Sequence, residues 1–136
     1  MNKTDDAIAK LPGQRQTRQR TEVFAVIQQA PGPLTVPEIH EHVQRTMPHT
    51  GIATIYRTVK LLLEANLIQS VTLPTGETRY ESAALGHHHH FQCKRCGQVV
   101  DIDHCPVSIA GETELPGGYL LEDHEITMYG RCPKCR

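Results

Sequence analysis

Two cysteine pairs of identical spacing constrain this chain more than any other feature of its sequence. Cys93 and Cys96 form the first pair, and Cys132 and Cys135 form the second. Each pair offers two thiolates on a tight turn, and four thiolates without an open position make a closed, structural zinc site. A redox pair usually follows a strand in a βαβ unit, and that context is absent here. The sequence therefore predicts a small domain folded around zinc.

A run of four histidines stands just before the first cysteine pair, at His87–His90. Side chains alternate between the two faces of a β-strand. If the run is a strand, His88 and His90 point one way, and His87 and His89 point the other. The run then divides into two half-sites, each of which needs further ligands.

Further ligands for both half-sites are present in the sequence. Glu81 and Asp101 are the acids nearest to His88 and His90, and together they make a mixed nitrogen and oxygen set that suits Fe²⁺, Mn²⁺ or Zn²⁺. For the other half-site, we expect His124 to be the third ligand.

The composition is consistent with two small domains that need bound metal for stability. The 136 residues include no Trp, aromatic residues make up 4%, and the mean hydropathy is −0.40. Neither half can bury a large core, and small domains usually need a disulfide or a metal. The first residues contain no apolar run, so we expect no signal peptide or membrane span and a cytoplasmic location.

The first 81 residues have the pattern of three helices followed by a hairpin. Thr17 caps a helix to about Ala30, Thr35 opens a second with a capping box, and Thr50 caps a third. Residues 67–73 and 78–81 then read as paired strands. This is the order of a winged helix, which places its third helix in the DNA major groove. The same order also occurs in modules that bind no DNA.

The third helix is expected to bury one face and expose the other. The predicted buried face comprises Ile52, Ile55, Val59, Leu62, Leu63 and Asn66, and the opposite face comprises Thr54, Arg57, Thr58 and Leu61.

The second half is expected to be a small α/β domain, which makes the fold class α+β. We predict a winged-helix domain over residues 1–81, a hinge over 82–86 and a metal-binding domain over 87–136. Within the last, the sequence favours a strand, a turn and a strand over 87–103, a weakly helical stretch over 106–118, and a final strand over 120–129.

Charge is distributed unevenly. Residues 1–80 hold nine Lys and Arg against seven Asp and Glu (+2), and residues 81–136 hold five against eight (−3), giving the net −1. Lys10, Arg15, Arg18 and Arg20 form a basic stretch with no acid among them. It is either a solvated helix start or an arm that contacts phosphates.

Three motifs together resemble the ferric uptake regulator family of metal-sensing repressors. They are GIATIYRTVKLL at Gly51–Leu62, HHHHFQCKRCG at His87–Gly97 and YGRCPKC at Tyr129–Cys135. The resemblance extends from about Leu11 to Arg136. It implies a DNA-binding winged helix, a hinge, a small α/β half that makes a homodimer, and no enzymatic activity.

The resemblance also implies a role for individual residues. It implies structural zinc at Cys93, Cys96, Cys132 and Cys135; a regulatory metal at Glu81, His88, His90 and Asp101; a second regulatory metal at His87, His89 and His124; and DNA contacts from Arg15, Tyr56 and Arg57. Arg15 is the residue expected in the minor groove, where narrow A·T-rich DNA attracts cations.

The sequence departs from the family pattern in three places. The family often supplies a ligand histidine before the second helix, where this chain has Gly32-Pro33-Leu34. The acid that completes the second regulatory site is left open between Glu112 and Glu114. His104 and Cys105 are interpreted as bystanders, although roles as ligands or as a redox handle remain open.

These features predict a repressor that binds DNA when a divalent metal joins its halves. A thiolate-free site favours Fe²⁺ or Mn²⁺ over Zn²⁺, because nitrogen and oxygen ligands suit those ions. The alternatives are a zinc-uptake or a peroxide-sensing regulator of the same family. An aspartate at position 101 resembles the peroxide-sensing members. A metallohydrolase would need a cleft and a general base, which the sequence does not show. A metal-buffering protein would not need Tyr56 and Arg57 on an open helix face.

Overall fold

The computed structural model describes residues 7–11, 17–105, 109 and 112–136. The chain divides into two compact units, residues 1–85 and 86–136. The division between Leu85 and Gly86 falls inside the predicted hinge, although Ser82 at its start still belongs to a strand.

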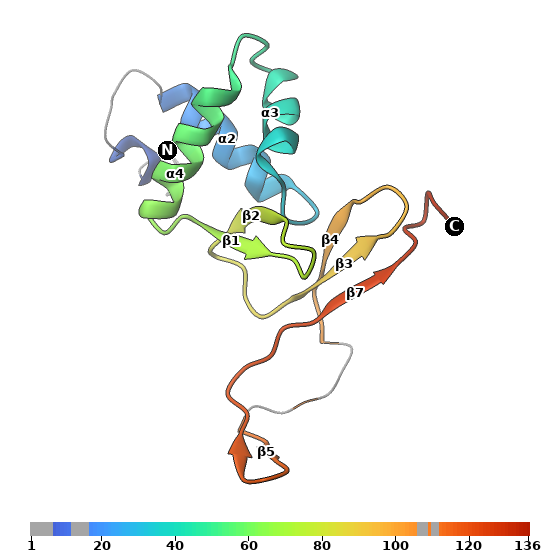
Figure 1. The fold of residues 1–136 in the computed structure, drawn as a ribbon. Coiled ribbons are helices and arrows are strands. Elements are labelled where there is room, and N and C mark those ends of the chain that lie inside the picture. Colours follow the sequence, from blue (N-terminus) through green and yellow to red (C-terminus); the bar gives the residue numbers. More distant parts are fainter. Residues whose placement is uncertain (1–6, 12–16, 106–108, 110–111) are drawn as a thin grey trace. The chain divides into compact units, whose positions relative to one another are not determined.

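In the described part of the first unit, three main helices and a hairpin follow one another in the order that the sequence predicts, and residues 7–9 form one further helical turn before them (Figure 1). The helices are α2 (Thr17–Gln29), α3 (Val36–Gln44) and α4 (Ile52–Glu64). Strands β1 (Ile68–Thr72) and β2 (Thr78–Ser82) pair antiparallel, with Val71 opposite Arg79. This arrangement is a winged helix, with α4 as its third helix and the hairpin as its wing.

The starts of α3 and α4 differ in how they are capped. Thr35 Oγ1 accepts a hydrogen bond from the Glu38 amide at 3.3 Å, and Pro37 lies in the first turn, as the capping-box pattern predicts. The prediction that Thr50 caps the next helix is wrong. Gly51 is the N-cap of α4, and as a glycine it has no side chain to accept a hydrogen bond from the first amides.

The buried face of α4 is narrower than predicted and is rotated toward Thr58. The buried residues are Ile55, Thr58, Val59 and Leu62. Thr58 was expected on the open face but is buried. Ile52 and Asn66 were expected on the buried face, but Ile52 is 42% exposed, and Asn66 is exposed beyond the helix end with φ 56°. A threonine hydroxyl can bond to a carbonyl of its own helix, so it can be buried without a distant partner.

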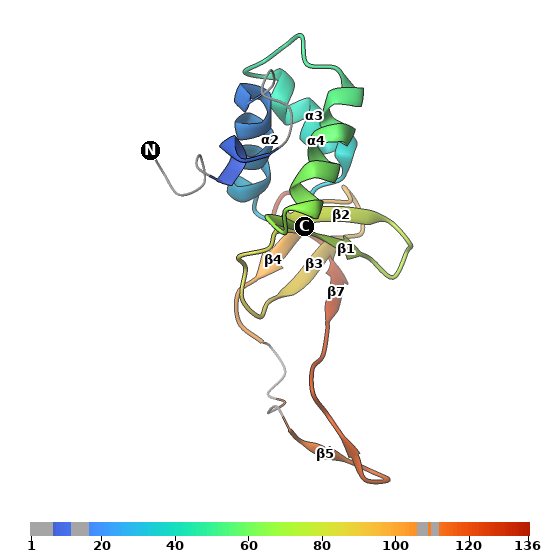
Figure 2. The same ribbon diagram turned by 90° about the vertical axis from the view of Figure 1, so that its left-hand side faces the viewer.

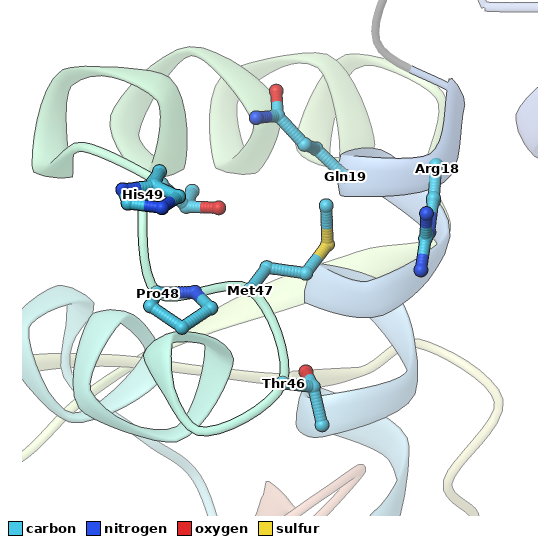
Figure 3. A pocket seen from close by; sticks show the side chains of 7 residues that line it. Arg18, Gln19, Thr46, Met47, Pro48 and His49 are labelled. Atoms are coloured by element: carbon cyan, nitrogen blue, oxygen red, sulfur yellow. The ribbon is translucent and has the colours of Figure 1, made fainter.

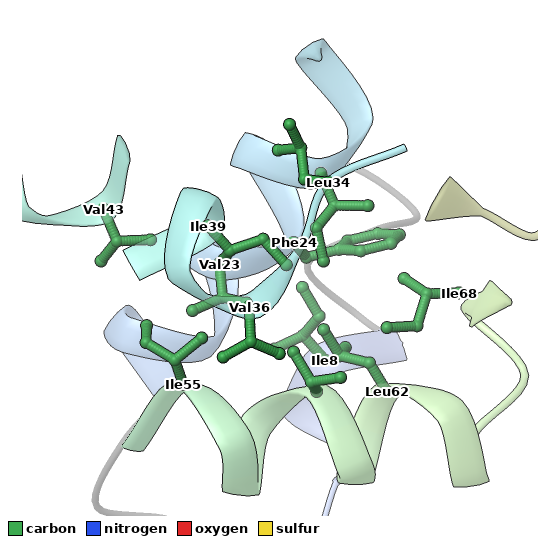
Figure 4. Close-up of a cluster of buried hydrophobic side chains, with 12 residues drawn as sticks. Ile8, Val23, Phe24, Leu34, Val36, Ile39, Val43, Ile55, Leu62 and Ile68 are labelled. Carbon is green, nitrogen blue, oxygen red and sulfur yellow. The ribbon is translucent and has the colours of Figure 1, made fainter. Parts of the chain in front are cut away.

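One apolar core holds the first unit together. Figure 4 shows Ile55 and Leu62 projecting from α4 among side chains of the other helices. The core comprises Ile8, Val23, Phe24, Ile27, Leu34, Val36, Ile39, Val43, Ile55, Val59, Leu62 and Ile68.

Truncating Leu62 to alanine is expected to destabilise this unit by about 2–5 kcal/mol, since Leu62 is fully buried and its loss leaves a cavity. Urea unfolding followed by far-ultraviolet circular dichroism measures the change. Ile52→Ala on the same helix is the control, because Ile52 is 42% exposed and should cost less than about 1 kcal/mol. Equal losses in the two variants would contradict the assigned core.

The second unit is built on a three-stranded sheet (Figure 2). Strand β3 (His89–Cys93) lies in the centre, antiparallel to β4 (Val99–Ile102) and parallel to β7 (Thr127–Gly130). A separate small hairpin joins β5 (Glu114–Leu115) to β6 (Tyr119–Leu120).

Two predictions for this unit are wrong. The described residues within 106–118 contain no helix, and Glu114 and Leu115 instead form a strand followed by a turn at Pro116–Gly118. The expected strand over 120–129 is interrupted, because residues 121–126 are irregular and β7 begins at Thr127. His124 therefore lies in an irregular segment.

Among the described residues, no helix is long and apolar enough to cross a bilayer.

Candidate metal centres and nucleic-acid interface

The four knuckle cysteines converge at one end of the three-stranded sheet. Their sulfur atoms all lie within 4.8 Å of one another, and Cys96 Sγ is 3.8 Å from Cys132 Sγ. A tetrahedral zinc with bonds of about 2.3 Å to sulfur would separate its ligands by about 3.8 Å. None of the five cysteines forms a disulfide. The residues thus fit the predicted structural zinc site.

The backbone around Cys93 favours its thiolate, which is the form that binds metal. The amides of Cys96, Cys132 and Arg95 lower the pKa of the Cys93 thiol to about 6, against the opposing effect of burial. The Cys132 amide approaches the Cys93 sulfur at 3.4 Å. The neighbouring thiol of Cys132 and burial together raise the pKa of Cys135. The thiol of Cys135 therefore needs a nearby cation before it can ionise beside the thiolate of Cys93.

The second group lies on one face of β3 and β4. The Nε2 atoms of His88 and His90 lie 3.7 and 3.5 Å from the same Asp101 carboxylate oxygen. His90 and Asp101 are direct cross-strand partners. His88 Nδ1 donates to the Gly86 carbonyl at 2.7 Å, which leaves Nε2 with its lone pair directed at the group.

Glu81, predicted as the fourth ligand of this group, lies on β2 of the first unit. It is the cross-strand partner of Gln69, whose Nε2 donates to it at 2.9 Å. This bond fixes one carboxylate oxygen of Glu81 on the wing.

The segment that lacks the family histidine is fixed to the wing by an arginine. Arg79 Nη1 donates to the Pro33 carbonyl at 3.1 Å and contacts the Glu38 carboxylate at 3.1 Å. Leu34 and Tyr80 exchange backbone hydrogen bonds at 3.0 and 2.8 Å. Because the Arg79 side chain is only 4% exposed, the segment is held by a buried guanidinium.

The third group lies on the opposite face of β3. Nε2 of His89 is 3.1 Å from Nε2 of His87 and 3.2 Å from Nε2 of His124. Cys105 Sγ completes the group, at 3.2 Å from His89 Nε2 and 3.4 Å from His124 Nε2. The four histidines thus divide between two faces, as strand alternation predicts.

His89 is the buried centre of this third group, with 1% of its surface exposed. Burial and the neighbouring imidazoles, His87 first among them, lower the pKa of His89 below its usual value. A neutral imidazole is the form that binds metals, so the surroundings prepare His89 for this role.

Cys105 is the residue that sequence reasoning undervalued. The acids expected to complete this group, Glu112 and Glu114, are exposed and do not belong to it. His104 is exposed and belongs to none of the three groups found among the described residues. The signal in the sequence that could have placed Cys105 near His89 was its position three residues after β4, the strand that pairs with β3.

The open face of α4 presents the two residues predicted to contact DNA. Tyr56 is 55% exposed, and Arg57 is exposed with its Nη2 donating to Thr54 Oγ1 at 3.3 Å. Arg15, the third predicted contact, lies outside the described residues.

A pocket of about 210 Å³ lies between the start of α2 and the loop that leads to α4 (Figure 3). Arg18 on α2 and His49 in the loop line it. Both side chains can carry positive charge, and the uncapped first amides of α4 begin two to three residues later. Helix N-termini and cations are the usual partners of phosphate groups.

Comparisons with known proteins agree with this geometry. The sequence model of the Ferric uptake regulator family matches residues 12–129. The chain is 32% identical over 128 residues to the ferric uptake regulation protein of Synechococcus elongatus, covering 91% of this chain and 87% of that protein. It is 30% identical over 125 residues to the zinc uptake regulation protein of Mycobacterium tuberculosis, covering 91% and 96%.

The fold is also similar to that of a solved structure, a zinc-bound manganese uptake regulator. The TM-score is 0.74 at 27% identity, covering 96% of this chain and 99% of that one. These three relatives are named after three different metals. The matched range includes the winged helix and all three groups, apart from the last cysteine pair. The chain therefore belongs to the ferric uptake regulator family of metal-responsive transcriptional regulators.

Proposed function

We propose that this chain is a homodimeric repressor that binds A·T-rich operator DNA when its regulatory site holds Fe²⁺ or Mn²⁺. Members of the family are transcriptional regulators that bind DNA as dimers with metal ions. The observation that carries the proposal is the group of His88, His90 and Asp101, whose ligand atoms lie within 4.8 Å of one another. Binding operators and keeping thiols reduced both call for a cytoplasmic location.

Glu81 is proposed as the ligand that couples this group to the wing. It belongs to β2 of the first unit, whereas the histidines belong to the second. When bound, the metal would favour one orientation of the two units, and so one separation of the two α4 helices in a dimer. That separation must match the half-site spacing on DNA. Metal binding then shifts the population toward the DNA-binding state.

The donor chemistry supports Fe²⁺ or Mn²⁺ at this group. Imidazole nitrogens and a carboxylate suit these ions, and the group contains no thiolate. Zn²⁺ binds more tightly to most sites of this kind, so availability in the cell decides which ion is sensed. Regulators named after zinc or peroxide response are therefore the alternatives within the family.

A DNA-binding titration tests the proposal. The protein keeps its knuckle zinc, and its other sites are emptied by a chelator. It is then titrated at fixed salt into an A·T-rich duplex and a G·C-rich one, with Fe²⁺, Mn²⁺ or Zn²⁺ buffered at equal free concentrations. We expect Fe²⁺ or Mn²⁺ to raise the affinity for the A·T-rich duplex by about 5- to 150-fold. Equal affinity with and without metal would contradict the proposal.

Arg57→Ala is expected to weaken operator binding by about 1–3 kcal/mol, which is the usual value of an arginine contact to a base. Fluorescence anisotropy at fixed salt measures the loss on the preferred duplex and on a scrambled one. The loss should be larger on the preferred duplex, because a base contact carries sequence information.

Lys94→Ala is the matched control for this variant. It removes the same unit of charge from an exposed residue of the knuckle turn. It should leave the preference between the two duplexes unchanged. If Lys94→Ala and Arg57→Ala have equal effects, the α4 face is not the surface that recognises bases.

A further inference from the structure

Cys105 gives the third metal group a donor of a different chemical class. We propose that Cys105 and the imidazoles of His87, His89 and His124 form a closed three-nitrogen, one-sulfur site that selects zinc over iron and manganese. The inference deepens the proposed metal-dependent function, because it adds a second metal specificity to the same unit. All four residues belong to the second unit, so the site does not depend on the first.

The distances match one tetrahedral ion better than they match a chain of hydrogen bonds. Bonds of about 2.05 Å to nitrogen and 2.3 Å to sulfur place tetrahedral ligands about 3.3 Å apart for two nitrogens and about 3.5 Å for nitrogen and sulfur. Two of the three nitrogen pairs, both of which include His89, measure 3.1 and 3.2 Å, and two of the three nitrogen–sulfur pairs measure 3.2 and 3.4 Å. All four ligand atoms lie within 4.8 Å of one another. His89 Nε2 meets three donor atoms at once, and a neutral nitrogen can form a hydrogen bond with only one of them.

The fold brings Cys105 to this position from the neighbouring strand. His89, the first residue of β3, pairs with Ile102, the last residue of β4. The chain therefore leaves β4 beside His89, and Cys105 comes three residues later. From the other side, Asp123 Oδ1 accepts the His124 backbone amide at 2.8 Å, which orients the irregular segment that carries the third imidazole.

Carboxylates lie near this group without entering it. Glu122 and Asp123 line a pocket of about 230 Å³, together with His87 and His124. This pocket gives a cation an acidic approach to the two outer imidazoles. The donor set itself contains no carboxylate among the described residues. It therefore differs from the His88, His90 and Asp101 group, which contains no sulfur.

This difference predicts different metals on the two faces of one strand. Thiolate and imidazole together suit zinc, a borderline-soft ion that accepts tetrahedral geometry. Four protein donors leave no open position, so the site would bind without catalysing. The opposite face, with imidazole and carboxylate, suits Fe²⁺ or Mn²⁺. The regulator would then respond to two ions through two sites.

Cobalt spectroscopy tests the thiolate directly. The full-length protein is first loaded with one equivalent of Zn²⁺ to fill the knuckle, and Co²⁺ is then titrated. We expect a near-ultraviolet sulfur-to-cobalt charge-transfer band, together with the intense visible bands of tetrahedral Co²⁺. Cys105→Ser should abolish the charge-transfer band and weaken Zn²⁺ binding at this site by at least about 100-fold, more than the loss of an outer-shell partner costs. His124→Ala should abolish the tetrahedral spectrum.

His104→Ala is the control, since His104 is exposed and lies outside the group. It should leave the cobalt spectrum unchanged. Retained knuckle zinc and an unchanged circular dichroism spectrum show that each variant folds. Superimposable cobalt spectra for the wild-type protein and Cys105→Ser would overturn the inference. That result would not contradict the proposed DNA-binding function, which the DNA titration tests separately. Conversely, a protein that shows the charge-transfer band but binds no DNA would support the zinc site and contradict the proposed function.

Discussion

Replacing Cys132 with serine is expected to unfold the second unit while the first unit keeps its helices. The reason lies in what the second unit buries. Its buried apolar residues, within the described part of the chain, are Cys93, Val99 and Cys132. Two of these three are knuckle cysteines. Apart from Val99 and His89, the buried side chains of this unit therefore belong to the zinc site, and there is little apolar area to replace it.

The size of the destabilisation by Cys132→Ser follows from comparing the free energy of zinc binding with the stability of a whole domain. Structural zinc sites contribute about 10–16 kcal/mol of apparent binding free energy near neutral pH. Whole domains are stable by only about 5–15 kcal/mol. Losing one thiolate and its metal thus removes as much free energy as the unit has. The first unit has an apolar core of its own and does not depend on this contribution.

Amide NMR spectra of the full-length protein measure the result, because they report on the two units separately. Signals from residues 86–136 should collapse to random-coil positions, and signals from α2, α3 and α4 should persist. Cys105→Ser is the matched control, as it removes the one cysteine outside the knuckles. A Cys132→Ser protein with a dispersed spectrum for the second unit would show that the zinc site is not its structural centre.

How far the sequence predicts this structure depends on how local each signal is. The Thr35 cap, the hairpin over 68–82 and the two cysteine turns are each specified within a few residues, and the structure confirms them. The division of the histidines is equally local, because strand alternation alone determines it.

Two of the errors concern features that distant contacts decide, and a third concerns a local turn signal. Thr58 is buried because α4 is oriented by the helices packed against it, which the helical period does not show. Cys105 meets His124 across 19 residues of chain that contain no regular periodicity. Residues 114–120 form a hairpin because Gly117 and Gly118 adopt positive φ angles of 90° and 83°, which suit a turn. The glycines and prolines there were a turn signal, and they outweigh a weak helical pattern.

His90→Ala is expected to abolish the metal dependence of DNA binding and to leave the fold intact. His90 supplies one of two imidazoles on its face of β3, and its Nε2 lies 3.5 Å from Asp101. Without it, a single imidazole and carboxylates remain to hold the regulatory metal. The ratio of operator affinities with and without Fe²⁺ or Mn²⁺ should fall from about 5- to 150-fold to about one. The affinity of the metal-free protein should not change.

The same DNA titration, run on His90→Ala and on a His104→Ala control, measures this ratio. Retained knuckle zinc excludes misfolding as the cause of any loss. His88→Ala should reproduce the loss, and the double variant should add nothing, because both residues act through one ion. A metal-dependent His90→Ala protein would show that His88, His90 and Asp101 are not the controlling site.

His124→Ala decides which face of β3 controls DNA binding. It removes a donor from the sulfur-containing group and leaves His88, His90 and Asp101 complete. If the thiolate-free group controls the orientation of the two units, His124→Ala keeps its Fe²⁺ or Mn²⁺ response and loses only a response to zinc. If His124→Ala abolishes every metal response while His90→Ala abolishes none, control belongs to the opposite face. The two variants therefore separate two sites that lie on a single strand.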